Sequence, residues 1–138
     1  MKYMLDANVL SELTKPEPNA GVMLRFGRHS LECAICAPVL HELEYGIGRL
    51  ADGRRKQRLS QFLEGLLDEG LEVLPYDRRA AHLHAIERVR LMRRGDAMPY
   101  VYSQIAAITG ANNLTLVTRN MADFRRFFDI RLEDWFAV

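Results

Sequence analysis

The chain has 138 residues, 49% of them hydrophobic and 27% charged, a composition that suits one compact domain over residues 1–138. A net charge of +1 argues against a protein held to nucleic acid by bulk electrostatic attraction. No targeting segment begins the chain, and no apolar run approaches the roughly 18 residues that cross a bilayer. We therefore expect a cytoplasmic protein that does not contact membranes.

Strand and helix patterns alternate through the first half of the chain. A short strand over Lys2–Leu5 precedes a helix over Val9–Thr14, which ends before Pro16 because proline disfavours helix in the preceding residue. Asn19 is a typical cap for a second helix through Arg28. The next elements are a buried strand over Cys33–Ala37 and a helix from Pro38 through Leu50, with proline in its first turn.

The second half continues the alternation. Apolar residues at helical spacing predict two long helices, and their stripes at Leu59–Leu67 and Ala80–Met92 are expected to be core, with a docking groove as the alternative. The expected elements are helices over Arg54–Asp68, Asp77–Arg94, Pro99–Gly110 and Ala122–Phe128, and strands over Leu71–Leu74, Leu114–Thr118 and Ile130–Leu132. This order predicts an α/β fold with a mostly parallel sheet sandwiched by helices.

The two cysteines, Cys33 and Cys36, have C-x-x-C spacing, which raises redox and zinc sites as hypotheses. Residues three apart in a strand point to opposite faces, so the pair does not share one metal or one disulfide. No second cysteine pair supplies further zinc ligands, although His29 and His41 are near. We therefore expect two buried, reduced thiols.

Polar residues follow the strands at the edge where parallel sheets bind ligands. Asp6 ends the first strand, Glu42 lies early in the helix after the second, and Asn120 follows the Leu114–Thr118 strand. Alone, Asp6 or Asn120 could simply cap a helix and Glu42 could be solvated. Their joint placement favours a site at this edge.

Several stretches, in order, make the chain resemble the PIN-domain family, and within it the VapC and FitB toxins of bacterial toxin–antitoxin pairs. The similarity covers the whole length, and its segments are Leu5-Asp6-Ala7-Asn8-Val9, Glu42-Leu43-Glu44-Tyr45-Gly46-Ile47, Gln104-Ile105-Ala106-Ala107-Ile108, Leu116-Val117-Thr118-Arg119-Asn120 and Asp134-Trp135. The resemblance implies a PIN-like ribonuclease domain whose acidic residues bind Mg²⁺ or Mn²⁺.

The resemblance also assigns site positions. Asp6 matches the first acid, Glu42 the second and Asn120 a fourth position that is Asp or Asn in relatives, with Asp123 in reserve and Ser11 near the metal shell. The third acid is an aspartate that opens the helix with Ile105-Ala106-Ala107. In this chain that position is Tyr102, so one metal ligand is lost.

Tyr102 puts catalysis in question. Phosphodiester hydrolysis needs an activated water and neutralisation of developing charge, which a carboxylate-held metal supplies. A protonated tyrosine removes a ligand charge and can fill the metal's place. Asp6 and Glu42 could still bind a metal weakly. We predict an endoribonuclease inactivated by an acquired or engineered change, since Asp and Tyr codons differ by one base. The alternative is a natural, degenerate module that binds antitoxin or RNA without cleaving, with Asp96 the nearest compensating acid.

The resemblance implies partners too: a cognate antitoxin packed in a groove, a transfer or ribosomal RNA substrate, DNA only through the antitoxin, and a homodimer or toxin–antitoxin hetero-oligomer. Arg119, Arg125 and Arg126 are candidates for RNA phosphate contacts. The basic stretches at Arg54–Arg58 and Arg88–Arg94 are expected to be mainly solvated helix faces. Asp6-Ala7-Asn8 is also similar to the nucleophile loop of haloacid-dehalogenase-like phosphatases, but Asn8 occupies their second acid's place.

Overall fold

The centre of the molecule is a parallel sheet. A computed structural model describes residues 1–136 and contains a five-stranded sheet in the order β3-β2-β1-β4-β5, in which every neighbouring pair is parallel. The strands are β1 (Tyr3–Leu5), β2 (Cys33–Cys36), β3 (Glu72–Leu74), β4 (Thr115–Val117) and β5 (Arg131–Glu133). The predicted α/β class is confirmed, and β1 occupies the predicted central place.

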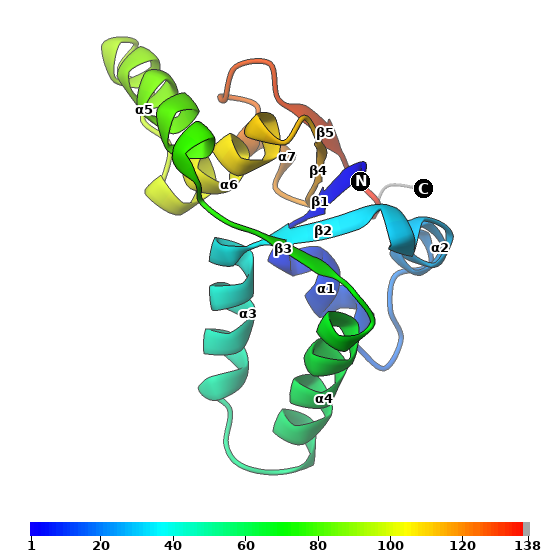
Figure 1. Ribbon diagram of the computed structural model, residues 1–138. Coiled ribbons are helices and arrows are strands. Elements are labelled where there is room, and N and C mark those ends of the chain that lie inside the picture. Colours follow the sequence, from blue (N-terminus) through cyan, green and yellow to red (C-terminus); the bar gives the residue numbers. More distant parts are fainter. Residues whose placement is uncertain (137–138) are drawn as a thin grey trace.

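Helices connect the strands and form two arms. Figure 1 shows α3 and α4 as a hairpin on one side of the sheet, while α5 extends away on the other side. Among residues 1–136, no helix is long and apolar enough to span a membrane. The helices are α1 (Ala7–Leu13), α2 (Ala20–His29), α3 (Ala37–Gly48), α4 (Arg54–Asp68), α5 (Arg78–Arg93), α6 (Tyr100–Ala111) and α7 (Met121–Phe124), with a short 3₁₀ turn over Ser30–Glu32.

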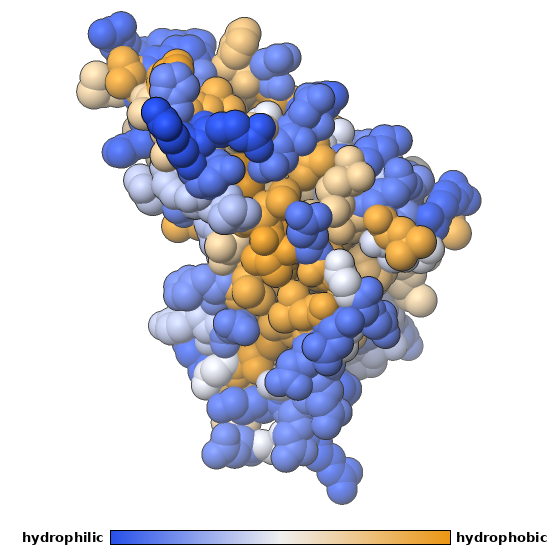
Figure 2. All heavy atoms as spheres, in the orientation of Figure 1, coloured by the Kyte–Doolittle hydropathy of each residue, from blue (hydrophilic) through white to orange (hydrophobic). Residues whose placement is uncertain are grey.

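The core lies on both faces of the central strands. Every residue of β1 and β2 is buried, as expected for a parallel strand covered on both sides. The middle of α6 also lies inside, with Ile105 and Ile108 fully buried. Figure 2 shows apolar residues along the middle of one face, over β3 and between α3 and α4, whereas hydrophilic residues cover the tip of the α3–α4 arm.

Most predicted boundaries differ from the observed ones by one or more residues, as three examples show. Helix α1 begins at Ala7, two residues early, because the Asp6 carboxylate accepts the Ala7 amide and caps the helix directly after β1. Helix α7 ends at Phe124 instead of Phe128, since the chain turns there and Asp129 adopts φ 57°. Strand β5 begins at Arg131 and not at Ile130.

The expectation that both apolar stripes are core was partly wrong. On α5, Ile86, Val89 and Met92 are exposed. The buried face instead repeats at Ala80, His84, Glu87 and Leu91, a 3.6-residue period that includes two polar side chains. Those polar groups are satisfied: the buried His84 ring hydrogen-bonds the Tyr76 hydroxyl and the Ser103 hydroxyl, both at 2.7 Å. On α4, only Leu63 is buried.

The two cysteines are buried and unpaired, as predicted. Burial raises the pKa of both Cys33 and Cys36 to about 12, so both stay as thiols at neutral pH. A buried, protonated thiol is a poor nucleophile.

The C-terminal segment closes the fold through Trp135, which is fully buried and packs edge-on against Tyr3 with ring centroids 5.2 Å apart. Its carbonyl oxygen accepts a hydrogen bond from the Arg25 guanidinium on α2. The same oxygen would lie 2.5 Å from a Cβ placed on Gly21. Gly21 therefore permits the close approach of α2 to the C-terminal segment.

Replacing Gly21 with alanine should lower the free energy of unfolding by about 1–3 kcal/mol, because the new methyl overlaps a backbone oxygen that cannot move aside cheaply. Gly27 on the same helix is the matched control, since nothing lies within 4 Å of an added Cβ there. Gly27→Ala should raise stability by about 0.5–1 kcal/mol. Urea unfolding followed by Trp135 fluorescence measures both. Equal effects of the two substitutions would contradict the packing of Gly21 on Trp135.

Candidate active site

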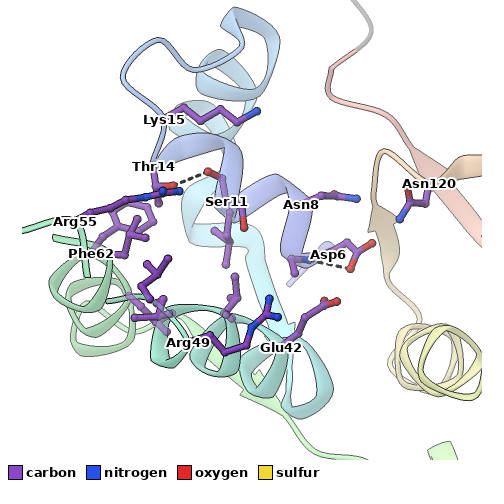
Figure 3. Close-up of a pocket in the computed structure, with 18 of the residues that line it drawn as sticks. Asp6, Asn8, Ser11, Thr14, Lys15, Glu42, Arg49, Arg55, Phe62 and Asn120 are labelled. Carbon is purple, nitrogen blue, oxygen red and sulfur yellow. Dashed lines mark hydrogen bonds between the residues drawn. The ribbon is translucent and has the colours of Figure 1, made fainter. Parts of the chain in front are cut away.

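A cavity of about 550 Å³ opens between α1, α3 and α4. Its lining includes Asp6, Glu42, Tyr102 and Asn120, so the four predicted site residues are brought to one place. Figure 3 shows Asp6, Glu42 and Asn120 at one end of this cavity, and Thr14, Lys15 and Arg55 at the other. Asp6 directly follows β1, Glu42 lies on the helix after β2, and Asn120 follows β4. Tyr102 lies in the first turn of α6.

Asp6 is the most deeply placed of the four, with only 4% of its surface exposed. One carboxylate oxygen accepts the Ala7 amide at 2.8 Å, and the other accepts the Thr118 hydroxyl at 2.8 Å. Its own amide donates to the Val117 carbonyl at 2.9 Å, which continues the β1–β4 pairing. The carboxylate is thereby fixed at the centre of the sheet's carboxyl edge.

Thr118 couples two of the predicted residues. Its hydroxyl donates a hydrogen bond to the Asp6 carboxylate and accepts one from the backbone N–H of Asn120 at 3.0 Å. Asn120 occupies the cap position of α7, but its side chain makes no capping hydrogen bond. A capping role therefore does not explain Asn120, which lines the cavity.

Tyr102 occupies the first turn of α6 and is half-buried. Its ring packs on Phe124, with centroids 5.1 Å apart and planes inclined by 38°. Burial raises the pKa of the phenol, and the negative charges of Asp123, Asp6 and Glu42 raise it further. The phenol therefore stays protonated at neutral pH.

The two acids on the cavity wall hold their protons more tightly than free carboxyls do. Burial raises the pKa of Asp6, against the opposing hydrogen bonds from Thr118 and Ala7. Loss of surrounding water and the nearby charge of Asp6 raise the pKa of Glu42. Clustered, partly desolvated carboxylates are costly without a cation, which is the electrostatic character of a metal site.

Asp6→Asn should stabilise the metal-free protein by about 1 kcal/mol at neutral pH, since it removes a buried charge while the side-chain oxygen still caps α1. Because folding raises the pKa of Asp6, the ionised group destabilises, and the cost disappears as falling pH protonates it. The gain should therefore shrink in acid. Urea unfolding at neutral and acidic pH measures this, with the exposed Asp68→Asn as control. A destabilised Asp6→Asn variant at neutral pH would refute the expectation.

The other acids considered from sequence take different places. Asp96 lies 3.7 Å from Arg126 and lines a separate cavity beside α5, away from Asp6 and Glu42. Its position offers no compensation for Tyr102. Asp123 lies 3.8 Å from the same guanidinium and is half-exposed on its side chain. Asp123 is close enough to Tyr102 to affect the pKa of the phenol.

The arginines predicted to contact RNA differ in exposure and in their protein partners. Arg126 donates to the Ala97 carbonyl at 2.9 Å besides pairing with Asp96 and Asp123, so it has a structural role between α7 and the segment before α6. Arg119 is exposed, with its guanidinium 4.6 Å from the Phe136 ring. Arg125 is also exposed. Phosphate contact stays a prediction for Arg119 and Arg125.

Sequence reasoning missed three basic residues of the cavity wall: Lys15, Arg49 and Arg55. Arg55 belongs to a stretch expected to be mainly a solvated helix face. Arg49 carried a usable signal, because it lies seven residues after Glu42 on one helix and so shares its face. Leu59, Phe62 and Leu63 of α4 complete the apolar part of the wall. The cavity therefore has an acidic end and an apolar wall. Arg49 lies beside Glu42, Arg55 lies at the opposite end, and Lys15 is paired with Glu12 at 2.9 Å.

Comparison with known proteins agrees with this geometry. The PIN domain matches residues 3–127. The tRNA(fMet)-specific endonuclease VapC of Salmonella typhimurium is 33% identical over 135 residues, 98% of each chain. A crystal structure of FitAcB from Neisseria gonorrhoeae superposes with a TM-score of 0.88 at 28% identity, covering 99% of both chains. A crystal structure of DNA-bound VapBC from Salmonella typhimurium gives a TM-score of 0.85 at 32% identity over 98% of both chains. The chain thus belongs to the PIN-domain family, among the toxins of the VapC and FitB type.

Proposed function

We propose that this chain is the toxin of a toxin–antitoxin pair, built as a metal-dependent endoribonuclease and silenced at its third acid position. The observation that carries the proposal is the place of Tyr102, whose neutral phenol lines the same cavity as the carboxylates of Asp6 and Glu42. RNA as substrate is supported by the relative named as a tRNA(fMet)-specific endonuclease. Whether transfer or ribosomal RNA is cut depends on surfaces outside the acid cluster.

The residues present fit a divalent metal only in part. Asp6, Glu42 and Asn120 supply two carboxylates and one amide, which are oxygen donors of the kind Mg²⁺ or Mn²⁺ prefers. Over residues 1–136, no group of three or more His, Cys, Asp or Glu side chains is gathered closely enough to hold a metal. We assign no catalytic step to this chain as it stands. A carboxylate at position 102 would add the missing charged donor.

The groove beyond the acids suits an antitoxin segment. Several solved relatives are toxin–antitoxin complexes, three of them described as bound to DNA. An antitoxin segment with apolar side chains would lie against Leu59 and Phe62, and a basic side chain would reach Asp6 and Glu42. We expect DNA contact only through that antitoxin, and a toxin homodimer or a toxin–antitoxin hetero-oligomer as the assembly.

Tyr102 also supports a second candidate function, a PIN module that binds antitoxin or RNA without cleaving. The two hypotheses separate on Mn²⁺-dependent cleavage of total RNA by the chain and by Tyr102→Asp. Cleavage by Tyr102→Asp alone supports a silenced ribonuclease. No cleavage by either chain, with antitoxin still bound, rejects the enzyme and supports the binding module. Cleavage by the unmodified chain rejects silencing by Tyr102.

A further inference from the structure

The first turn of α6 carries Tyr102, and side chains from outside the helix hold this turn in place. Pro99, at the cap position, makes no side-chain capping hydrogen bond, and Tyr100 and Val101 are 52% and 45% exposed. Ser103, by contrast, is 1% exposed. The turn therefore has a buried hydroxyl directly beside position 102 in sequence.

A chain of hydrogen bonds connects this turn to two other parts of the fold. The Ser103 hydroxyl donates to the Tyr100 carbonyl at 2.9 Å, so its oxygen is left to accept from Nε2–H of His84 on α5 at 2.7 Å. Nδ1 of the neutral His84 ring then accepts from the hydroxyl of Tyr76, which lies between β3 and α5, also at 2.7 Å. We call Tyr76, His84 and Ser103 the His84 link.

The groups around His84 favour the neutral imidazole that the link needs. The Tyr100 ring lies 5.0 Å from the imidazole, and the Arg88 guanidinium lies 5.2 Å from the centre of the Tyr100 ring. Burial and the positive charge of Arg88 lower the pKa of His84. Burial and a hydrogen bond with Tyr100 raise the pKa of Tyr76, which therefore remains a donor. At neutral pH the imidazole has one donor and one acceptor, and both are used.

The His84 link fixes more than the spacing of α5 and α6. An apolar side chain would fill the same space without burying polar groups, whereas directed hydrogen bonds also fix the height and rotation of the α6 first turn. Successive residues on a helix point roughly 100° apart. With Ser103 held against α5, Tyr102 lines the cavity that Asp6 and Glu42 also line. A metal ligand has to be held to within about 0.5 Å.

We propose that His84 is a positioning residue for this site: through Ser103 it holds the first turn of α6, so that the side chain at position 102 is directed into the cavity. The inference rests on the proposed function, and it extends the site from the acid cluster to the contact between α5 and α6. A carboxylate introduced at position 102 would therefore depend on His84 for its place.

Calorimetric titration of Mn²⁺ into Tyr102→Asp, with and without His84→Ala, tests this role under conditions where each variant is folded. His84→Ala should weaken Mn²⁺ binding about tenfold, the lower end of the loss that follows removal of a contact behind metal ligands. His84→Gln should stay within about threefold, because its amide supplies a donor and an acceptor like those of the ring. Glu87→Ala is the matched control on α5: Glu87 is buried but hydrogen-bonds Arg90 and Phe128, so Mn²⁺ affinity should change less than about twofold.

Amide hydrogen exchange in the unmodified chain reports on the turn without any metal. The Ser103 amide donates to the Pro99 carbonyl at 3.1 Å, and at the other end of α6 the Asn112 amide donates to the Ile108 carbonyl at 3.2 Å. His84→Ala should speed exchange at position 103 about tenfold or more and leave Asn112 within about twofold. Should His84→Ala not fold, Ser103→Ala removes the same hydrogen bond with a smaller change and should show the same pattern.

The outcomes separate this role from the proposed function. Equal Mn²⁺ affinity with and without His84→Ala, or unchanged exchange at position 103, would overturn the inference and leave the proposed ribonuclease standing. An equal loss of affinity in Glu87→Ala would also overturn it, because reduced stability would then be the cause. If Tyr102→Asp neither binds Mn²⁺ nor cleaves RNA with His84 intact, the proposed function fails and the positioning role fails with it.

Discussion

Tyr102→Asp is expected to cleave RNA in Mg²⁺ or Mn²⁺ at a rate at least about 100-fold above that of the unmodified chain. A third carboxylate would supply the ligand charge that the phenol lacks, and a firmly held metal contributes several kcal/mol of charge stabilisation to phosphodiester hydrolysis. Loss of the ring's contact with Phe124 also opens space at the acidic end of the cavity.

Two variants control this result. Tyr102→Phe removes only the hydroxyl and adds no ligand, so it should remain as inactive as the unmodified chain. Asp6→Ala added to Tyr102→Asp should abolish the restored cleavage, because Asp6 is the buried acid at the centre of the site. Activity in Tyr102→Phe would show that relief of steric blockage, not a new carboxylate, restores the enzyme.

Glu87→Ala should lower the free energy of unfolding by about 3 kcal/mol, the largest stability effect we expect. Glu87 is buried on α5 and accepts two hydrogen bonds from Arg90, at 2.9 and 2.8 Å, and one from the Phe128 amide at 2.9 Å. Arg90 in turn donates to the Arg126 carbonyl. Removing the carboxylate takes one partner from the Arg90 guanidinium and the hydrogen-bond acceptor from the Phe128 amide.

The pH dependence of this loss has a definite sign. Burial alone would raise the pKa of Glu87, but the hydrogen bonds from Arg90 and Phe128 outweigh it and the pKa falls below its usual value. The stabilisation is therefore present at neutral pH and disappears as the pH falls through the acidic range. Urea unfolding across that range measures it, with the exposed Glu64→Ala as a control within about 0.5 kcal/mol of the parent. An equal effect of both variants would refute the role given to Glu87.

The fold and the acid positions were predictable from sequence for identifiable reasons. Buried parallel strands leave continuous apolar runs, and the residue after such a run marks the sheet edge where ligands bind. This reasoning predicted that Asp6 and Asn120 lie at that edge, and Glu42 was placed near them because it lies early in the helix that follows β2. The departure at Tyr102 was visible because the surrounding residues matched the family pattern.

The remainder depended on tertiary contacts that no local pattern encodes. The buried polar face of α5, with His84 and Glu87, depends on partners 19 and 41 residues away in sequence. The pairing of Asp96 with Arg126 requires the segment before α6 to meet α7. The need for glycine at position 21 arises because the Trp135 carbonyl, far along the chain, packs against it. Such contacts are set by the whole fold, so helical spacing on its own mispredicted the α5 surface.

The most direct measurement of the central claim is calorimetric titration of Mn²⁺ into the unmodified chain and into Tyr102→Asp. If position 102 belongs to a metal-binding carboxylate cluster, Tyr102→Asp will bind Mn²⁺ at least about tenfold more tightly, and Asp6→Ala will remove that gain. Equal, weak affinity in both chains would contradict the account, because the carboxylate at position 102 would then contribute nothing to a metal site.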